Sequence, residues 1–89
     1  MKFNISKIIL KDIEGKEIPY ELHKTVGNII YYGTRDLKIA EIGKEIYTGK
    51  EVEMSQEDIN KIKEILNNKE LSNMTPIAIR TIEEYLVIK

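Results

Sequence analysis

The sequence has no cysteine, no tryptophan, one histidine and two prolines among its 89 residues. Without cysteine the chain forms no disulfide, no thiolate zinc site and no thiol nucleophile, so its fold depends on packing. No apolar run approaches the roughly 20 residues that span a bilayer. The N-terminus also lacks the apolar core of a signal peptide. We therefore expect a cytoplasmic protein.

The chain also lacks an excess of positive or negative charge. It has 14 Lys and Arg and 15 Asp and Glu, which give a formal net charge of −1. Nucleic-acid-binding proteins usually carry a basic face, since phosphate neutralisation supplies much of their affinity. The nearest approach to one here is Lys2, Lys7 and Lys11, which precede the first acidic residue. This spacing is also typical of a solvated strand face. A small nucleic-acid-binding regulator is therefore the alternative hypothesis.

The composition that is present, 42% apolar and 33% charged, is typical of a globular chain. Its length predicts a single domain over residues 1–89. A chain this short buries only roughly 60 to 65% of the surface that its unfolded form exposes. It therefore has one small core and no room for a deep enclosed cavity, which disfavours an enzyme with a large substrate.

Residues 2–11 predict a strand, because apolar and polar side chains alternate and β-branched residues are frequent. Phe3 and Ile5 share one parity, whereas Ile8 and Leu10 share the other. This change of phase predicts a bulge midway, or burial of both faces later in the strand.

A turn is predicted at residues 12–16, with Gly15 in the positive-φ conformation that a tight connection needs. A second strand should follow, with Ile18 and Tyr20 on one face. Pro19 cannot donate a hydrogen bond to a ladder, so this strand should lie at an edge.

From residue 21 the apolar period becomes helical and predicts two successive helices. The first should end at Gly33, and the second should begin at a Thr34 or Asp36 cap and end before Gly49. The residues expected to face inward are Leu22, Val26, Ile29 and Ile30 of the first helix, and Leu37, Ala40, Gly43, Ile46 and Tyr47 of the second. Gly27 and Gly43 inside these helices predict a close crossing, or else a shorter first helix.

Two further helices follow a short strand or linker at residues 51–54. Ser55 and Asp58 form a capping-box pattern at the start of the third helix, which stops near residues 67–68. Thr75 caps the fourth helix, and Pro76 takes its first position. The inward stripes are Ile59, Ile62, Ile65 and Leu66, then Ala78, Ile79, Ile82, Tyr85 and Leu86. The sequence thus predicts an α+β fold: an N-terminal antiparallel β-hairpin, with a third short strand near 51–54, packed against about four α-helices.

Residues with catalytic or metal-binding chemistry are sparse. His23 is the single histidine and has neither a nucleophile nor further metal ligands in a fixed pattern, which favours a surface or boundary position. Asp12, Glu14 and Glu17 around Gly15 depart from a calcium loop, because the glycine comes too early and a lysine follows it. We therefore predict a protein that is not an enzyme and needs no cofactor and no metal.

Tyrosines are the first candidate binding residues. Tyr31 and Tyr32 are adjacent, and neighbours on a helix point about 100° apart, so one of the pair should be exposed. Exposed tyrosines are favoured binding anchors because they combine a large apolar area with a polar tip. Tyr20 on the second strand belongs to the same set. The alternative is that these rings only cover the edge of the core.

An acidic group is the second candidate. Glu51, Glu53, Glu57 and Asp58 are the densest acidic cluster of the chain and flank a helix start. Carboxylates at a helix start are stabilised by the macrodipole without any functional role. The alternative is an acidic surface that a basic partner recognises, with an affinity that weakens as salt rises.

The order of several motifs resembles that of a diffuse group of small phage and prophage proteins of unsettled function. The motifs are the turn at residues 12–16, the Lys-Glu-Ile-Tyr stretch at 44–47, the segment 51–59 and the Thr-Pro helix start at 75–76. The resemblance implies a mobile-element origin and a non-enzymatic role.

The leading hypothesis is therefore a phage or prophage accessory protein that binds another protein stoichiometrically through a strand edge or a helix face. Two roles stay open: virion assembly, and inhibition of a host defence complex. Because unpaired hairpin edges invite another strand, we also expect a homodimer.

Overall fold

Helices dominate the computed structural model, which describes the backbone of residues 2–18 and 20–88 and the side chains as far as Leu86. The elements are β1 (Lys2–Phe3), the 3-10 helix η1 (Ile5–Lys7), β2 (Leu10–Lys11), β3 (Glu17–Ile18), α1 (Leu22–Gly33), α2 (Leu37–Tyr47), β4 (Val52–Glu53), α3 (Gln56–Asn67) and α4 (Pro76–Ile88). In the described residues the strands form two antiparallel pairs, β1 with β4 and β2 with β3. This is the α+β fold that the sequence predicts.

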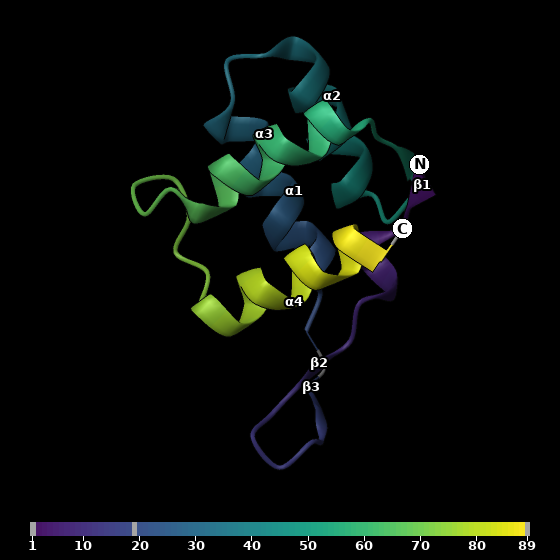
Figure 1. Ribbon diagram of the computed structural model, residues 1–89, viewed down its shortest axis with the longest axis vertical. Coiled ribbons are helices and arrows are strands. Elements are labelled where there is room, and N and C mark those ends of the chain that lie inside the picture. The colour runs from purple at the N-terminus through teal and green to yellow at the C-terminus, as the bar shows by residue number, and fades with distance from the viewer. Residues whose placement is uncertain (1, 19, 89) are drawn as a thin grey trace.

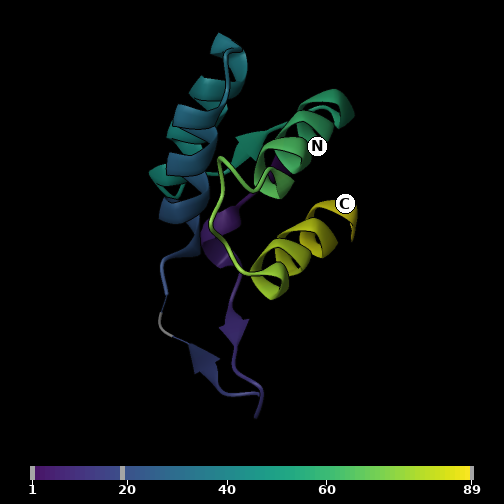
Figure 2. The same cartoon turned by 90° about the vertical axis from the view of Figure 1, so that its left-hand side faces the viewer.

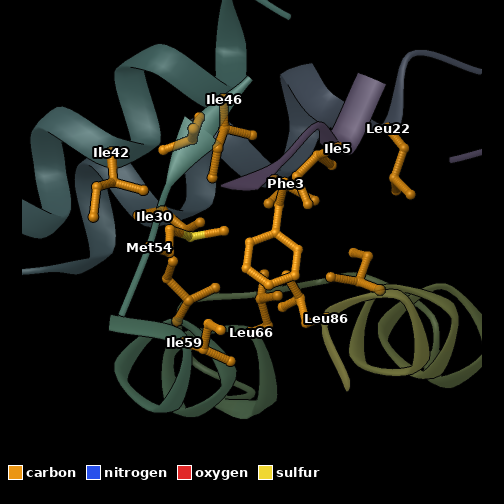
Figure 3. Packing of buried hydrophobic residues seen from close by; sticks show 14 of the residues in the cluster. Phe3, Ile5, Leu22, Ile30, Ile42, Ile46, Met54, Ile59, Leu66 and Leu86 are labelled. Atoms are coloured by element: carbon orange, nitrogen blue, oxygen red, sulfur yellow. The ribbon is translucent and has the colours of Figure 1, made fainter. Parts of the chain in front are cut away.

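The helices lie in two layers (Figure 1), one of α1 and α2 and the other of α3 and α4 (Figure 2). The β1–β4 pair lies between these layers, so that Phe3 points into the centre of the core near Met54, Leu66 and Leu86 (Figure 3). Buried side chains from both layers join one cluster: Phe3, Ile5, Leu22, Val26, Ile30, Ile39, Ile42, Ile46, Val52, Met54, Ile59, Ile62, Leu66, Ala78, Ile82 and Leu86. Each large one contributes about 1.5 to 3 kcal/mol by leaving water.

The prediction of one continuous strand over residues 2–11 is wrong. The chain leaves the β1–β4 ladder at Asn4, whose side chain accepts a hydrogen bond from the Ser6 backbone N–H at 3.0 Å. Lys7 N–H then donates to the Asn4 carbonyl at 3.1 Å and closes the turn of η1. Asparagine offers the backbone such local hydrogen bonds in competition with a ladder. The change of phase in the sequence therefore marks a helical turn, where we expected a bulge or a doubly buried strand.

The predicted turn at residues 12–16 is confirmed. Gly15 has φ +86°, and Asp12 Oδ1 accepts hydrogen bonds from the backbone N–H groups of Glu14 and Lys16, both at 2.9 Å. The Asp12 N–H donates to the Lys16 carbonyl at 2.8 Å, which completes the link between the strands. These bonds are all local, so the turn depends little on the rest of the fold.

Residues 10–18, here called the arm, consist of β2, this turn and β3. Leu10 pairs with Ile18 and Lys11 with Glu17. The arm projects from the helices along the longest axis of the molecule (Figures 1 and 2), and every residue from Lys11 to Ile18 is exposed. The prediction that Pro19 marks an edge strand lies outside the described residues.

The predicted glycine crossing of α1 and α2 is confirmed. A Cβ added to Gly27 would lie 2.7 Å from the Gly43 carbonyl oxygen and 2.7 Å from the Tyr47 Cβ. A Cβ on Gly43 would lie 2.9 Å from Ile30 Cγ2 and 3.0 Å from the Tyr31 backbone nitrogen. The two helices thus approach backbone to backbone, and α1 runs its full length to residue 33, against the alternative of a shorter helix.

The inward stripe of α2 agrees with the prediction only in part. Leu37 is 75% exposed and Tyr47 is 41% exposed, although both were expected to face inward. Ile39 and Ile42 are buried in their place, beside the correctly predicted pair Gly43 and Ile46. The reason is that α2 packs on α1 through Gly43 and also on α3 in the other layer, which turns the buried side toward Ile39 and Ile42.

The helix boundaries in the structure agree closely with the caps predicted from the sequence. Asp36, the second of the two suggested caps, accepts a hydrogen bond from Lys38 N–H at 2.9 Å at the start of α2. Thr75 Oγ1 accepts from Ala78 N–H at 3.3 Å at the start of α4. Gly49 follows α2 with φ +82°. Among the described helices, none has the length and apolar character needed to cross a lipid bilayer.

Candidate functional site

Three exposed tyrosines, here called the tyrosine face, lie on the outer side of the α1–α2 pair. Tyr32 is 81% exposed, Tyr31 44% and Tyr47 41%. The rings of Tyr31 and Tyr32 meet edge to face, with centroids 5.1 Å apart and an interplanar angle of 85°. Both members of the adjacent pair are therefore exposed, whereas the sequence led us to expect one. Such large, accessible aromatic rings are the side chains that protein interfaces favour.

The three tyrosines of this face border one hollow of about 170 Å³. Its remaining walls come from Gly27, Asn28 and Lys44. Asn28 and Lys44 are exposed and carry hydrogen-bond donors, so a ligand here meets both aromatic rings and polar groups.

The helix crossing creates this hollow. Because Gly27 has no side chain, Tyr47 packs directly over the α1 backbone, at a distance that a Cβ on Gly27 would not permit. Gly27 therefore has two effects: it lets α1 and α2 approach each other closely, and it allows Tyr47 of α2 to lie beside the tyrosines of α1.

Tyr32 also borders a second hollow. Ile29 and Gly33 of α1 line that hollow together with Leu71, which is 42% exposed. Tyr32 thus borders two hollows. A partner that covers Tyr32 and the second hollow would also contact the apolar side chains of Ile29 and Leu71.

Asp58 does not belong to an accessible acidic surface, because its side chain is only 6% exposed. It accepts a hydrogen bond from the Ser55 backbone N–H at 3.0 Å, while Ser55 Oγ accepts from the Asp58 N–H at 3.1 Å, which completes the predicted capping box. Lys38 Nζ lies 3.3 Å from Asp58 Oδ1. The hydrogen bonds from Ser55, and then Lys38, lower the pKa of this carboxyl below its ordinary value. The role of Asp58 that the structure shows is structural.

The other acidic residues of the predicted patch stand among cations. Glu57 lies 3.5 Å from Lys61 Nζ, and this amine also contacts Asp36 at 3.1 Å. The hydrogen bond from Lys61 lowers the pKa of Asp36, and Asp36 raises the pKa of Lys61. Glu53 lies opposite Lys2 in the β1–β4 pair, and Glu51 is exposed just before β4. This surface is therefore of mixed charge, and its exposed ion pairs contribute little to stability.

Tyr20 lies apart from the tyrosine face, at the base of the arm. It is 52% exposed, and its hydroxyl and the Thr25 hydroxyl are hydrogen-bonded at 2.6 Å. A hollow of about 330 Å³ lies here, in the corner between the arm and the N-terminal ends of α1 and α4. We call it the root hollow; its walls are Leu10, Tyr20, Leu22, Thr25, Asn73, Met74, Thr75 and Ala78.

Sequence reasoning missed three surface residues. It assigned Tyr47 to the core, and it gave no role to Lys44, although the two lie three residues apart and therefore on one side of α2. It also passed over Ile13 in the arm's turn, which is fully exposed at 103%. An isoleucine among turn residues was the available signal, because turns favour Gly, Pro, Asn, Asp and Ser.

The described residues contain no group of three or more His, Asp or Glu side chains placed to hold a metal ion. His23 is half-buried near Gly49, in the boundary position that the sequence favours.

Comparisons of the chain with protein-family models, with curated proteins and with solved structures found no match. Its function is therefore inferred from the chemistry of its surfaces.

Proposed function

We propose that this chain is a non-enzymatic phage or prophage accessory protein that acts in the cytoplasm by binding another protein stoichiometrically through the tyrosine face. The observation that carries the proposal is the clustering of Tyr31, Tyr32 and Tyr47 around one hollow. The mobile-element origin rests on the order of sequence motifs that ends in the Thr75–Pro76 helix start. Virion assembly and inhibition of a host defence complex are the two roles that fit a stoichiometric binder.

The tyrosine face has the physical features of a binding anchor. A ring that is 81% exposed, as in Tyr32, gains by burial, and it loses little conformational freedom because tyrosine has few rotatable bonds. Anchors of this kind contribute about 2 kcal/mol or more to protein complexes. Lys44 and Asn28 at the rim can donate to carbonyl or carboxylate groups of the partner. The face therefore suits a protein surface that offers an apolar side chain flanked by acceptors.

The nucleic-acid alternative has less support from the arrangement of the lysines. Lys2 belongs to the β1–β4 pair, Lys7 to η1 and Lys11 to the arm. Lys2 also lies opposite Glu53 in its strand pair. A polyanion would therefore meet dispersed charges, whereas affinity for nucleic acid depends on many simultaneous phosphate contacts. A shift assay with random DNA at low salt tests this, and strong binding that weakens steeply with salt would favour the regulator.

The test of the leading proposal compares the wild-type chain with two variants as baits in infected or lysogenic cells. Tyr32→Ser removes the most exposed ring of the tyrosine face. Leu37→Ser removes an apolar side chain that is 75% exposed but does not line the hollow, and so controls for general loss of apolar surface. Neither side chain is buried, so both variants should fold.

We expect a protein that the wild type and Leu37→Ser capture in a 1:1 ratio and that Tyr32→Ser loses. The captured protein is then purified, and titration calorimetry should show that Tyr32→Ser weakens the complex at least about tenfold. Equal binding by all three baits would refute the tyrosine face as the site. Turnover of a substrate by the purified chain would refute the non-enzymatic role.

A further inference from the structure

Ile13 is a fully exposed apolar side chain at the tip of the arm. Its exposed fraction is 103%, the highest among the large apolar residues whose side chains the structure describes. The neighbouring turn residues are held rigidly, because Asp12 accepts two backbone hydrogen bonds and Gly15 takes the positive-φ position. A rigid turn that presents an isoleucine to water can insert that side chain into an apolar hollow, since its burial is favourable.

The root hollow, at the other end of the same arm, is such a hollow. Leu10, Leu22 and Met74 give it apolar walls, and the hydroxyl groups of Tyr20 and Thr25, two further lining residues, are hydrogen-bonded to each other. At about 330 Å³ it has room for a branched aliphatic side chain, and it opens where the arm leaves the helices.

The isoleucine and the root hollow are separated by the length of the arm. Leu10 in the wall of the root hollow precedes Ile13 by three residues, which corresponds to roughly 10 Å of extended chain. We infer that two copies of this chain associate through antiparallel arms, so that Ile13 of each copy enters the root hollow of the other. A two-fold axis across the middle of the arms makes both contacts at once, as an isologous interface requires.

Two features of the arm favour a second copy as the occupant. In the described residues β2 and β3 pair only with each other, so the outer edge of each strand keeps unpaired backbone groups that another strand can join. The tip is also acidic, with Asp12 and Glu14 against Lys16, whereas Lys7, just before the root, is exposed and has no ion-pair partner among the described residues. Antiparallel arms place the acidic tip of one copy near the end of the other arm that Lys7 precedes.

Cysteine cross-linking tests this arrangement directly, because the natural chain has no cysteine. Ile13→Cys is mixed with Asn73→Cys, which places a thiol on the exposed wall of the root hollow. The control mixture pairs Ile13→Cys with Leu37→Cys, a thiol on α2 outside the hollow. We expect disulfide-linked dimers of one copy of each variant in the first mixture only. Equal yields in both mixtures, or dimers linked mainly through two Ile13→Cys chains, would overturn the inference.

Sedimentation equilibrium of cysteine-free protein provides the second measurement. Ile13→Ser should raise the dimer dissociation constant at least about a hundredfold, because a two-fold dimer loses both buried isoleucines and each loss weakens binding by roughly tenfold or more. Leu37→Ser and Tyr32→Ser should leave it unchanged, which separates this interface from the tyrosine face. A wild-type chain that stays monomeric at millimolar concentration, or an Ile13→Ser variant that dimerises as strongly as the wild type, would also overturn the inference.

Discussion

Replacing Gly27 by alanine tests the helix crossing on which the tyrosine face depends. The added methyl group would lie 2.7 Å from three atoms: the Gly43 carbonyl oxygen, the Tyr47 backbone nitrogen and the Tyr47 Cβ. Two of these are backbone atoms and the third is fixed to the backbone, so none can rotate away. The helices must therefore separate, which also moves Tyr47 away from Tyr31 and Tyr32.

Two opposing effects set the size of the change. Alanine is a better helix former than glycine by up to about 1 kcal/mol, which stabilises α1. Overpacking a close contact costs about 1 to 3 kcal/mol, and the upper end applies here because the neighbours are backbone. The net result should be a loss of about 2 kcal/mol, which for a domain of this size lowers the melting temperature by about 8 to 16 °C.

Thermal unfolding followed by circular dichroism measures this loss, with two comparisons. Gly43→Ala should lose less stability, because its new methyl group has more room: it would lie 2.9 Å from Ile30 Cγ2, 3.0 Å from the Tyr31 backbone nitrogen and 3.1 Å from the Gly27 carbonyl oxygen. Glu41→Ala, on the exposed side of α2, should change the free energy of unfolding by less than about 0.5 kcal/mol. A Gly27→Ala variant as stable as the wild type would show that helix propensity outweighs the contact and that the two backbones do not meet there.

Three further substitutions test other parts of the fold by urea or thermal unfolding. Asp58→Asn should cost about 1 kcal/mol at pH 7, because it weakens the cap with Ser55. Since the folded state lowers the pKa of Asp58, its contribution is present above about pH 4 and is lost as pH falls through the folded pKa, so the stabilities of wild type and variant should converge in acid. Tyr85→Phe should cost about 1 kcal/mol, because the Asn4 N–H that donates to its hydroxyl at 2.8 Å loses its acceptor; an unchanged stability would mean that water replaces the hydroxyl. Gly15→Ala should cost about 1 kcal/mol through backbone strain alone, because φ is +86° and no atom lies within 4 Å of the new methyl; a larger loss would reveal a contact that this geometry lacks.

The sequence predicted local features well because their hydrogen bonds close within a few residues. The capping box joins Ser55 to Asp58, and the arm's turn joins Asp12 to Lys16. The glycine crossing was also predictable, since a glycine inside a helix lowers its stability and a close approach of two helices can offset that loss. For the candidate site, Tyr31 and Tyr32 were found because neighbours on a helix cannot both face one small core.

The predictions from sequence failed where contacts between distant segments of the chain determine the structure. No residue near Phe3 in the sequence indicates that its strand partner is Val52. The sequence therefore predicted residues 2–11 as one strand of a hairpin, whereas only Leu10 and Lys11 pair with β3. The side that α2 buries depends on contacts with both α1 and α3, and this is why Tyr47 was assigned to the core. For the acidic residues, the sequence left helix stabilisation and a binding surface as alternatives; the structure shows the capping role of Asp58, and it adds Lys38 and Lys61, which contact Asp58 and Glu57 from elsewhere in the chain.

By itself, the sequence determined the four helices and the turn of the arm, because caps, turns and apolar periods act over a few residues, and it determined that no thiol chemistry is available. Only the tertiary structure decided which surfaces those elements present. The helix crossing at Gly27 brings Tyr47 beside the tyrosines of α1, and the packing of α4 against the base of the arm forms the root hollow. Both surfaces arise from contacts between segments far apart in the chain, which the pattern of any one segment does not specify.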